Sequence, residues 1–470
     1  MAAWKDDEIA TEALRGVIKA RKPLPRKYIL IGVSVAAVAL TAGAFLFRKP
    51  AETAPAPSAV SVKAAGVEEP KRAIESVPAP QPQPSATAPK IESDTPPPVP
   101  IGVKAAVPAE ARPRDGMLDS ARECLRAGRL SEALVQLTAK RAHPLEGVEQ
   151  QEAQVLAARV DLAGGDIASA RSKFEALALM PSDSAVGTDA LMGNFWCQAG
   201  TLSRCRDSEL EQVAGGPDSW GKAVALLEQA RRLEAKSGGN LGKLEEVRLL
   251  YQRALDTRGL EASAEKECVT NLTELTDRLV LDPKYACALP KAVFHKVESG
   301  DVLERIAKRY KVNQGQIKVL NRLSEKLTIR QGQILKMLPG DVVLKVDRAH
   351  LHGTLYIDGV FIRRYPVGIG PGNATPVGTY TISTKVANPD WYYDGKRIPF
   401  GHADNILGTR WMGFSTTELN GQGAGLGVHG TAFPSSVPGR ESKGCVRMIN
   451  KDVEELFDLM PQGGKVEIFD

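Results

Sequence analysis

Apolar residues follow a different pattern in each of five successive stretches of the chain. The first stretch is apolar throughout, and the second has almost no apolar pattern. The third has apolar residues three and four positions apart, as in helices, and the last alternates with a period of two, as in strands. Between them lies a short stretch that combines both patterns. The sequence therefore predicts a multidomain chain, divided at 28–47, 48–113, 114–290, 294–338 and 341–470.

The first apolar stretch, residues 28–47, contains neither charge nor proline. A helix of this length rises about 30 Å, which is the thickness of a bilayer core. Basic residues crowd its N-terminal side, whereas only Arg48 and Lys49 follow closely. The positive-inside rule then keeps the basic tail, residues 1–27, in the cytoplasm and exports the remainder. We expect a single transmembrane anchor; the alternative is a cleaved signal peptide, with cleavage near Ala42–Ala44.

Residues 48–113 are rich in proline and alanine, as in the run Pro78–Pro84. Proline has no amide hydrogen and favours an extended polyproline II backbone, so this stretch cannot build a core. It predicts a disordered linker that reaches on the order of 100–200 Å and holds the exported domains away from the membrane. A recognition motif for a proline-binding domain is the alternative.

Residues 114–290 predict an α-helical, repeat-like domain. A helix around Asp119–Leu125 is followed by a turn at Gly128 and a second helix, and the same plan recurs around Gly164 and Gly165. Small apolar residues before the glycine and an alanine after it resemble tetratricopeptide-type helix pairs. Further helices are expected over Val224–Ala235 and Glu245–Leu255. The domain serves as a protein-binding surface or as a spacer, and the pattern does not choose between them.

Residues 294–338 predict a small module with the order strand, helix, helix, strand. Asp301 is expected to cap the first helix, with Glu304 completing a capping box. The motifs Val-x-x-Gly-Asp-x-Leu, Ile-Ala-x-x-Tyr, Asn-x-Leu and Gly-Gln-x-Leu occur in this order. Together they resemble the LysM domain, a family that binds N-acetylglucosamine-containing glycans such as peptidoglycan. The resemblance implies sugar contacts at two loops, formed by Gly300, Asp301 and Val302 and by residues around Asn321.

Residues 341–470 predict a mostly-β domain with many glycines. Three runs, 342–346, 353–357 and 360–362, have the period of two that is typical of strands. With a turn at Asp358-Gly359, these runs indicate hairpin strands. A further strand is expected over 375–382, and a helix followed by a strand closes the chain over 450–469.

The candidate chemistry lies in this last stretch, at His429 and, sixteen residues later, Cys445. An imidazole near a thiol can take its proton and leave a thiolate, which is the reactive nucleophile. Gly444 permits close approach of a substrate carbonyl and presents backbone amides to an oxyanion. In an extended segment, Lys443 and Arg447 would point to the same side as the thiol and favour the thiolate. A buried cysteine and a satisfied histidine are the alternative that the residues alone leave open.

Two motifs surround the candidate pair: His-Gly-Thr at 429–431 and Ser-Lys-Gly-Cys-Val-Arg-Met at 442–448. Together they resemble the signature of the L,D-transpeptidase, or YkuD-type, catalytic domain. The resemblance covers 341–470 and includes Thr375-Pro376-x-Gly378 and Asn388-Pro389-x-Trp391. It implies a cysteine acyltransferase of the bacterial cell wall. Cys445 would attack the amide after the third residue of a tetrapeptide stem, expel D-alanine and hold the stem as a thioester. The stem would then pass to an acceptor amine, which forms a 3-3 cross-link.

The resemblance also implies roles for the neighbouring residues. His429 would move the protons, and backbone amides near Gly444 would hold the oxyanion. Ser442 and the carbonyl of Gly430 would orient the imidazole. Arg447 would bind a stem carboxylate or serve as a structural ion-pair partner. Residue 443 is histidine in many members and lysine here, which argues that it is not the general base.

Two other functions fit the same motifs. An L,D-carboxypeptidase would use water as the acceptor with the same residues. A non-enzymatic, membrane-anchored scaffold would bind peptidoglycan through the LysM module and the helical domain, but the intact His429 and Cys445 argue against it.

The remaining histidines and cysteines predict no further chemistry. His352 repeats the His-Gly-Thr triplet without a following Ser-x-Gly-Cys, so we interpret it as structural. The other histidines are isolated, and no cluster has zinc-ligand spacing, which predicts neither metal nor cofactor. Outside the cytoplasm disulfides are permitted. Cys197–Cys205 and Cys268–Cys287 are close enough to pair, but sequence cannot fix the connectivity.

Composition adds limits on partners. A hydrophobic content of 43% and a charged content of 25% are those of a globular protein. A net charge of +5 and 5% aromatic residues are too low to indicate nucleic acid. The expected partners are peptidoglycan stems and glycan strands, the membrane through one helix, and a protein that binds the helical domain. The expected location is the bacterial inner (cytoplasmic) membrane, with most of the chain in the periplasm or cell wall.

Overall fold

The structure is a computed structural model that describes residues 116–140, 144–177, 183–285, 292–415 and 425–470. The predicted membrane anchor and the proline-rich linker lie outside these residues. Within the described ranges, none of the helices is both long and apolar enough to cross a bilayer.

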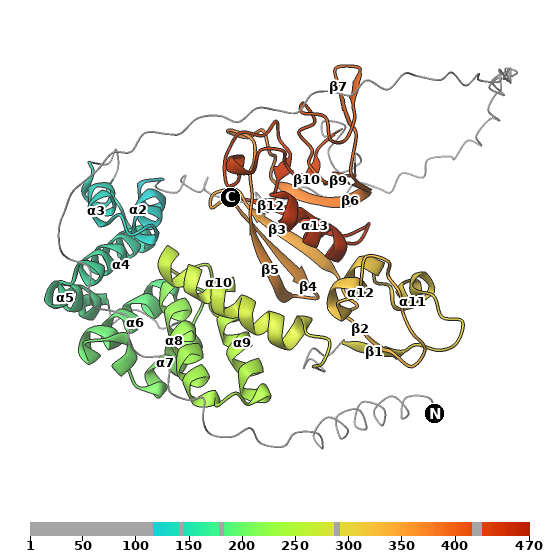
Figure 1. The fold of residues 1–470 in the computed structure, drawn as a ribbon. Helices are drawn as coiled ribbons and strands as arrows, with labels where there is room; N and C mark the ends of the chain where they lie inside the picture. Colours follow the sequence, from blue (N-terminus) through green and yellow to red (C-terminus); the bar gives the residue numbers. More distant parts are fainter. Residues whose placement is uncertain (1–115, 141–143, 178–182, 286–291, 416–424) are drawn as a thin grey trace, which may run out of the picture. The chain divides into compact units, whose positions relative to one another are not determined.

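The N-terminal half of the described chain is helical, as predicted (Figure 1). Glycines in the left-handed region end several helices, for example Gly165 with φ 86° after α4. Ser184, Ser219 and Asn240 cap α6, α8 and α9 by accepting backbone N–H groups. The helices are α2 (Gly116–Arg126), α3 (Leu130–Thr138), α4 (Gly147–Gly164), α5 (Ile167–Leu177), α6 (Ala185–Ala199), α7 (Asp207–Ala214), α8 (Trp220–Ser237), α9 (Leu241–Asp256) and α10 (Ala262–Thr276), followed by a π-helical turn over Asp277–Leu281.

The small module has the predicted βααβ order, but the predicted helix cap is wrong. Its elements are β1 (Val293–Lys296), α11 (Leu303–Tyr310), α12 (Gln314–Asn321) and β2 (Ile334–Met337), and the two strands pair antiparallel. Val302 occupies the N-cap position of α11 without a side-chain cap. The Asp301 carboxylate instead accepts from the Glu298 amide at 2.8 Å and lies 2.8 Å from His295 Nε2. Its side chain therefore closes the preceding turn and is not available to the helix.

The C-terminal domain is built on one eight-stranded sheet with the order β11-β10-β9-β6-β12-β3-β4-β5. The pairs β12/β3 and β10/β11 are parallel, and the others are antiparallel. The main strands are β3 (Val342–Asp347), β4 (His352–Ile357), β5 (Val360–Pro366), β6 (Gly378–Ala387), β9 (Arg410–Phe414), β10 (Gly427–His429), β11 (Val446–Arg447) and β12 (Lys465–Phe469). The helix α13 (Asn450–Leu459) packs its apolar face into the core of this sheet.

One predicted strand begins later than expected. The strand expected over 375–382 is β6, which starts at Gly378 and continues to Ala387. Pro376 has no N–H to donate to a ladder. The Thr375 hydroxyl instead accepts from the Gly370 amide at 2.8 Å, which ties this segment to the loop after β5.

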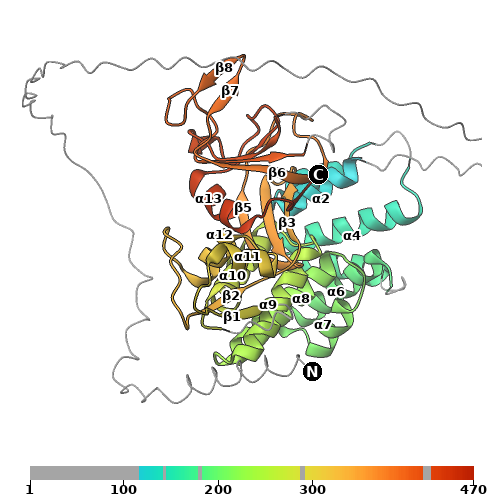
Figure 2. The same cartoon turned by 90° about the vertical axis from the view of Figure 1, so that its right-hand side faces the viewer.

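Two further strands form a separate hairpin, β7 (Trp391–Tyr393) and β8 (Lys396–Ile398). Both ribbon views show this hairpin standing away from the main sheet (Figures 1 and 2). Trp391 and Tyr393 stack on each other, with ring centroids 4.9 Å apart. Tyr393 is nevertheless exposed, and so is the intervening Tyr392.

The apolar cores of the helical domain and the sheet share residues. Tyr356 on β4 and Phe361 on β5 belong to the core of the helical domain. Conversely, Val280 and Leu281, from the turn after α10, belong to the core of the sheet. Leu320 of α12 also contributes to that core, which connects the βααβ module to it.

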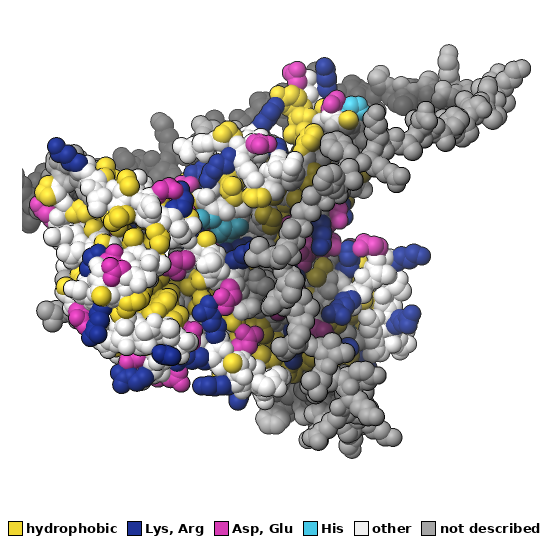
Figure 3. Space-filling model, turned by 60° about the vertical axis from the view of Figure 1, so that its left-hand side comes forward, with side chains coloured by type: hydrophobic (Ala, Val, Ile, Leu, Met, Phe, Trp, Pro, Cys, Tyr) yellow, Lys and Arg dark blue, Asp and Glu magenta, His cyan; other side chains and the backbone are white. Residues whose placement is uncertain are grey.

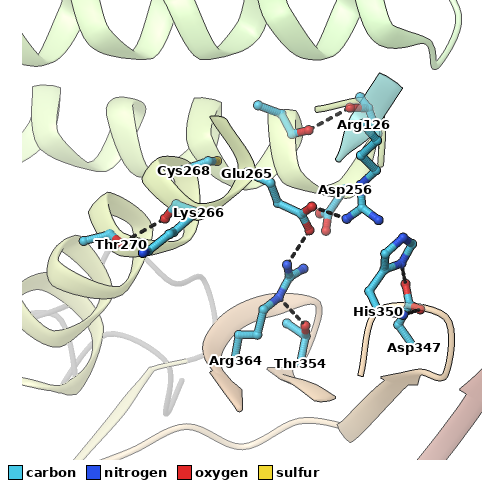
Figure 4. A network of polar contacts seen from close by, with 12 residues as sticks. Arg126, Asp256, Glu265, Lys266, Cys268, Thr270, Asp347, His350, Thr354 and Arg364 are labelled. Carbon is cyan, nitrogen blue, oxygen red and sulfur yellow. Dashed lines mark hydrogen bonds and ion pairs between the residues drawn. The ribbon is translucent and has the colours of Figure 1, made fainter. Parts of the chain in front are cut away.

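Charged side chains reinforce the contact between the helices and the sheet (Figure 4). The Glu265 carboxylate on α10 accepts from Arg126 on α2 and, at 2.5 Å, from Arg364 on β5. The Nε of Arg364 also donates to the Thr354 hydroxyl at 2.9 Å. Close by, His350 lies between Asp347 at 2.9 Å and Glu123 of α2 at 3.1 Å. Figure 3 shows histidine, basic and acidic side chains close together on this side of the molecule.

The possible disulfide between Cys197 and Cys205, which the sequence left open, is not formed, because both thiols are free and buried. Cys205 Sγ faces the Thr201 carbonyl at 4.0 Å. Cys268 is also free and donates to the Tyr251 carbonyl at 3.1 Å. Cys287 lies outside the described residues.

We expect Glu265→Gln to destabilise the protein by about 3 kcal/mol, because two partly buried guanidinium groups would lose their shared carboxylate. Burial raises the pKa of Glu265, but Arg364 and Arg126 outweigh this and hold it below the ordinary value. The check is urea denaturation of the intact protein at pH 7, compared with the wild type.

The control is Glu132→Gln, which removes an exposed ion pair with Arg129. Exposed pairs contribute about 0–1 kcal/mol. Equal losses in the two variants would show that the Glu265 contact is no stronger than a surface pair.

Candidate active site

The two candidate catalytic residues lie on neighbouring strands at one edge of the sheet. In the parallel β10/β11 pair, Val428 faces Val446 and His429 faces Arg447. Cys445 immediately precedes β11, so it lies two positions from the residue opposite His429. Because side chains alternate between faces, His429 and Arg447 belong to the same face of this pair, and Cys445 directly precedes its second strand. The structure thus brings together residues sixteen positions apart in sequence.

A tight turn presents Cys445. Gly444 has φ +124°, and a Cβ there would lie 2.5 Å from the Ala374 carbonyl oxygen, so only glycine fits. The Ser442 hydroxyl accepts from the Gly444 amide at 3.2 Å and donates to the Cys445 carbonyl at 2.7 Å. Ser442 therefore shapes this turn, whereas the sequence analysis expected it to orient the imidazole.

The His429 imidazole is buried and held by backbone carbonyls. Its Nδ1 lies 2.5 Å from the Gly430 carbonyl oxygen, which can only accept, so Nδ1 carries the proton and Nε2 is left as the basic nitrogen. Burial lowers the pKa of His429 to about 4, although the Gly430 and Leu407 carbonyls act in the opposite direction. The ring is therefore neutral at pH 7. Trp411 of β9 stacks on it at 5.9 Å between centroids, a contact that nothing in the sequence pattern indicated.

Cys445 is a thiol at rest, because its environment raises the pKa and does not favour the thiolate as expected. Burial raises the pKa of Cys445 and outweighs the Gly427 amide and Arg447, which both lower it. Its Sγ lies 3.5 Å from the Gly425 carbonyl oxygen. A neutral thiol beside a neutral imidazole requires proton transfer to the base during attack.

Lys443 does not contribute charge to the thiol as predicted, because Gly444 breaks the extended conformation. Its Nζ is 2.8 Å from the Tyr393 hydroxyl and 4.0 Å from the centre of the Tyr393 ring. The turn that carries Cys445 is thereby connected to the β7–β8 hairpin. The nearby Trp391 belongs to the Asn388-Pro389-x-Trp391 motif of the family resemblance, but the sequence indicated no role for Tyr393.

Arg447 is buried and donates to the Ser436 hydroxyl at 3.0 Å. Its Nε has no partner among the described residues, and none of their carboxylates pairs with the guanidinium. The ion-pair role therefore finds no partner in the described part of the chain, and the binding of a stem carboxylate stays a prediction.

The residues predicted to contact glycan lie in the βααβ module, in the turn before α11 and at the C-terminal end of α12, where Asn321 is the last residue. Gly300 has φ +88° in the turn before α11, and Val302 is 47% exposed. Asn321 is committed to its own module, because its amide bonds the backbone of Ile317 and Lys336 at 2.7–2.8 Å.

Three other histidines in the described part of the chain, His352, His350 and His295, lie against charged side chains. His352 lies on β4 beside Arg364, and burial lowers its pKa to about 4. His350 and His295 are not isolated as expected, since each lies against a carboxylate. No group of three or more His, Cys, Asp or Glu side chains in the described ranges is arranged to hold a metal ion.

Comparisons with known proteins identify the families of the two C-terminal domains. The model of the L,D-transpeptidase catalytic domain, YkuD, matches residues 341–468. The model of the LysM domain matches residues 295–337.

The chain is 37% identical to "Putative L,D-transpeptidase YqjB" of Bacillus subtilis over 134 residues, 28% of this chain and 74% of that protein. It is 29% identical to "Putative L,D-transpeptidase YkuD" of the same organism over 37% of this chain and 97% of that protein. A crystal structure of an L,D-transpeptidase from Mycobacterium tuberculosis aligns at 17% identity and a TM-score of 0.23 over 30% of this chain and 75% of that one. The extent of the match to the first of these proteins, together with the two family models, shows that the chain belongs to the L,D-transpeptidase family and carries a YkuD-type catalytic domain behind a LysM domain.

Proposed function

We propose that Cys445 is the nucleophile and His429 the general acid–base of a peptidoglycan L,D-transpeptidase. The observation that supports this assignment is the parallel β10/β11 pair, with the buried His429 on β10 and the partly exposed Cys445 directly before β11. Such a base works at neutral pH because it is unprotonated there.

In the first step, His429 Nε2 takes the Cys445 proton while Sγ attacks the carbonyl carbon of the third stem residue. The C–N bond to D-alanine then breaks, a thioester forms, and the imidazolium returns its proton to the leaving amine. The Gly430 carbonyl holds the Nδ1 proton throughout, which keeps Nε2 facing the reaction. Among the backbone amides near the thiol, that of Gly444 already bonds Ser442, so the Cys445 amide is the proposed oxyanion donor.

In the second step, an acceptor amine attacks the thioester and gives its proton to His429, which restores the thiol. An amine from a second stem yields a 3-3 cross-link. Water in its place yields an L,D-carboxypeptidase, with the same residues in the same roles. The distinction depends on what enters the site after D-alanine leaves.

We further propose that the LysM domain holds the enzyme on glycan strands and that residues 28–47 anchor it in the inner membrane. The first proposal rests on the family match and on the exposed loop at Val302. The second rests on the apolar span and its basic N-terminal flank. A mature N-terminus beyond Ala44 would replace the anchor with a cleaved signal peptide.

Cys445→Ser should abolish D-alanine release from tetrapeptide muropeptides and the thioester mass on the protein, since a hydroxyl ionises far less readily than a thiol. His429→Ala should lower turnover by roughly 10²–10⁴-fold with substrate binding retained. Both are checked by mass spectrometry of the products, which also separates dimers from shortened monomers. The control is His352→Ala, at the other His-Gly-Thr triplet, which should stay near the wild type. Loss of activity in His352→Ala with activity kept in His429→Ala would reverse the assignment.

The acid limb of the activity profile should lie at about pH 4. A base whose pKa is lowered by burial stays neutral down to that value, so activity is present above it and is lost as the pH falls through it. At pH 5.5 an exposed imidazole with a pKa of about 6.5 would retain about a tenth of its neutral form. The measurement is initial kcat/KM for D-alanine release between pH 3.5 and 8. A midpoint near pH 6.5 would mean that the base is not the buried His429.

Val302→Asp should weaken sedimentation with purified peptidoglycan, because it places a charge on an exposed apolar side chain in a proposed glycan loop. Turnover of soluble muropeptides should not change. Ile334→Asp is the matched control, since Ile334 is 46% exposed and lies on β2 of the same module. Equal binding of both variants and the wild type would remove Val302 from the glycan site.

A further inference from the structure

The side chain of Asn450, at the start of α13, joins two separate segments next to the catalytic imidazole. Its Oδ1 accepts from the Thr409 amide at 3.2 Å and from the Thr431 amide at 3.1 Å. Thr409 immediately precedes β9, and Thr431 lies two residues after the end of β10. One amide oxygen therefore holds together two stretches that are 22 residues apart in sequence.

These two segments carry the backbone carbonyls that act on His429. Gly430, whose carbonyl oxygen lies 2.5 Å from Nδ1, directly precedes Thr431. Leu407, whose carbonyl also raises the pKa of the imidazole, lies two residues before Thr409. The bonds from Asn450 thus fix the position of both groups that stabilise the Nδ1–H form and the transient imidazolium.

Two glycines make room for this amide. A Cβ on Gly408 or on Gly430 would lie 2.3 Å from Asn450 Oδ1, far inside contact distance. Gly408 in addition has φ +65°, which strains other residues. At Gly430 the Asn450 oxygen is the nearest atom that a Cβ would meet, whereas at Gly408 the Thr431 amide nitrogen, at 2.4 Å, also excludes a side chain.

We propose that Asn450 is a positioning residue for the transpeptidation reaction, holding the imidazole of His429 in its reactive tautomer and orientation through the Gly430 and Leu407 segments. The inference rests on the proposed function of His429. Asn450 touches neither the thiol nor the imidazole through a hydrogen bond, so its effect passes through the backbone that it ties. Without its oxygen, the Thr409 and Thr431 amides lose a shared acceptor, and the carbonyls beside them are free to shift.

The test compares two substitutions of similar size in the full-length protein. Asn450→Leu removes the acceptor and should lower kcat/KM for D-alanine release by about 10- to 100-fold, the scale of a small misplacement of a catalytic group. Asn450→Asp keeps an acceptor oxygen and should stay within about fivefold of the wild type. The neighbouring Lys451→Ala, an exposed position of the same helical turn, should match the wild type.

A double-mutant cycle separates positioning from a general structural role. In a His429→Ala background, Asn450→Leu should change the residual rate by less than about twofold, because the group that it positions is gone. A further 10-fold or greater loss in that background would overturn the proposal. So would an Asn450→Leu activity within about threefold of the wild type. If Asn450→Leu does not fold by circular dichroism, Asn450→Ala takes its place in both arms with the same expectations.

The same measurements distinguish failure of this inference from failure of the proposed function. If His429→Ala itself retains wild-type turnover, His429 is not the base and the positioning role falls with it. If His429→Ala is inactive while Asn450→Leu is unchanged, only the role of Asn450 is wrong.

Discussion

A pair of backbone hydrogen bonds between Gly368 and Arg447 connects the two ends of the eight-stranded sheet at one point. Gly368 lies two residues after β5, at one end of the strand order, and Arg447 belongs to β11 at the other. The Gly368 amide donates to the Arg447 carbonyl at 2.8 Å, and the Arg447 amide donates to the Gly368 carbonyl at 2.7 Å. β11 has only two residues, so its contact with Gly368, together with its pairing with β10, determines where Cys445 lies. The position of Cys445 depends on this connection because a two-residue strand has little rigidity of its own.

The three modules stabilise one another through shared cores. Aromatic side chains of β4 and β5 are buried among the helices, while Val280 and Leu281 enter the core of the sheet. Between α12 and α13, Lys318 pairs with Asp458, and Asn313 donates to the Leu459 carbonyl. The same helix α13 begins at Asn450, whose side chain bonds the Thr409 and Thr431 amides near His429. The LysM domain and the active site are therefore attached to opposite ends of a single helix.

Local patterns predicted the helices and most strands, because the spacing of apolar residues and the positions of glycines determine local structure over only a few residues. They also pointed to His429 and Cys445 as the candidate catalytic pair, and the structure places these residues on β10 and directly before the adjacent β11. What they could not predict depends on contacts distant in sequence. The direction of Lys443 depends on Gly444, whose conformation is required by Ala374, and the pKa of Cys445 depends on burial by the whole domain. Asp301 was expected to cap a helix, but His295 and the Glu298 amide compete for the same carboxylate.

The helical domain also protects the sheet from other molecules. The Gln252 side chain on α9 accepts from the Phe361 amide at 3.1 Å and donates to the Gly359 carbonyl at 2.7 Å. These two bonds pair the backbone groups at the start of the edge strand β5. Unpaired edge strands act as templates for intermolecular β-pairing. A fragment reduced to residues 341–470 would expose this edge beside the uncovered rings of Tyr356 and Phe361. Self-association of such a fragment would follow from the loss of its cover and would say nothing about the chemistry of its active site.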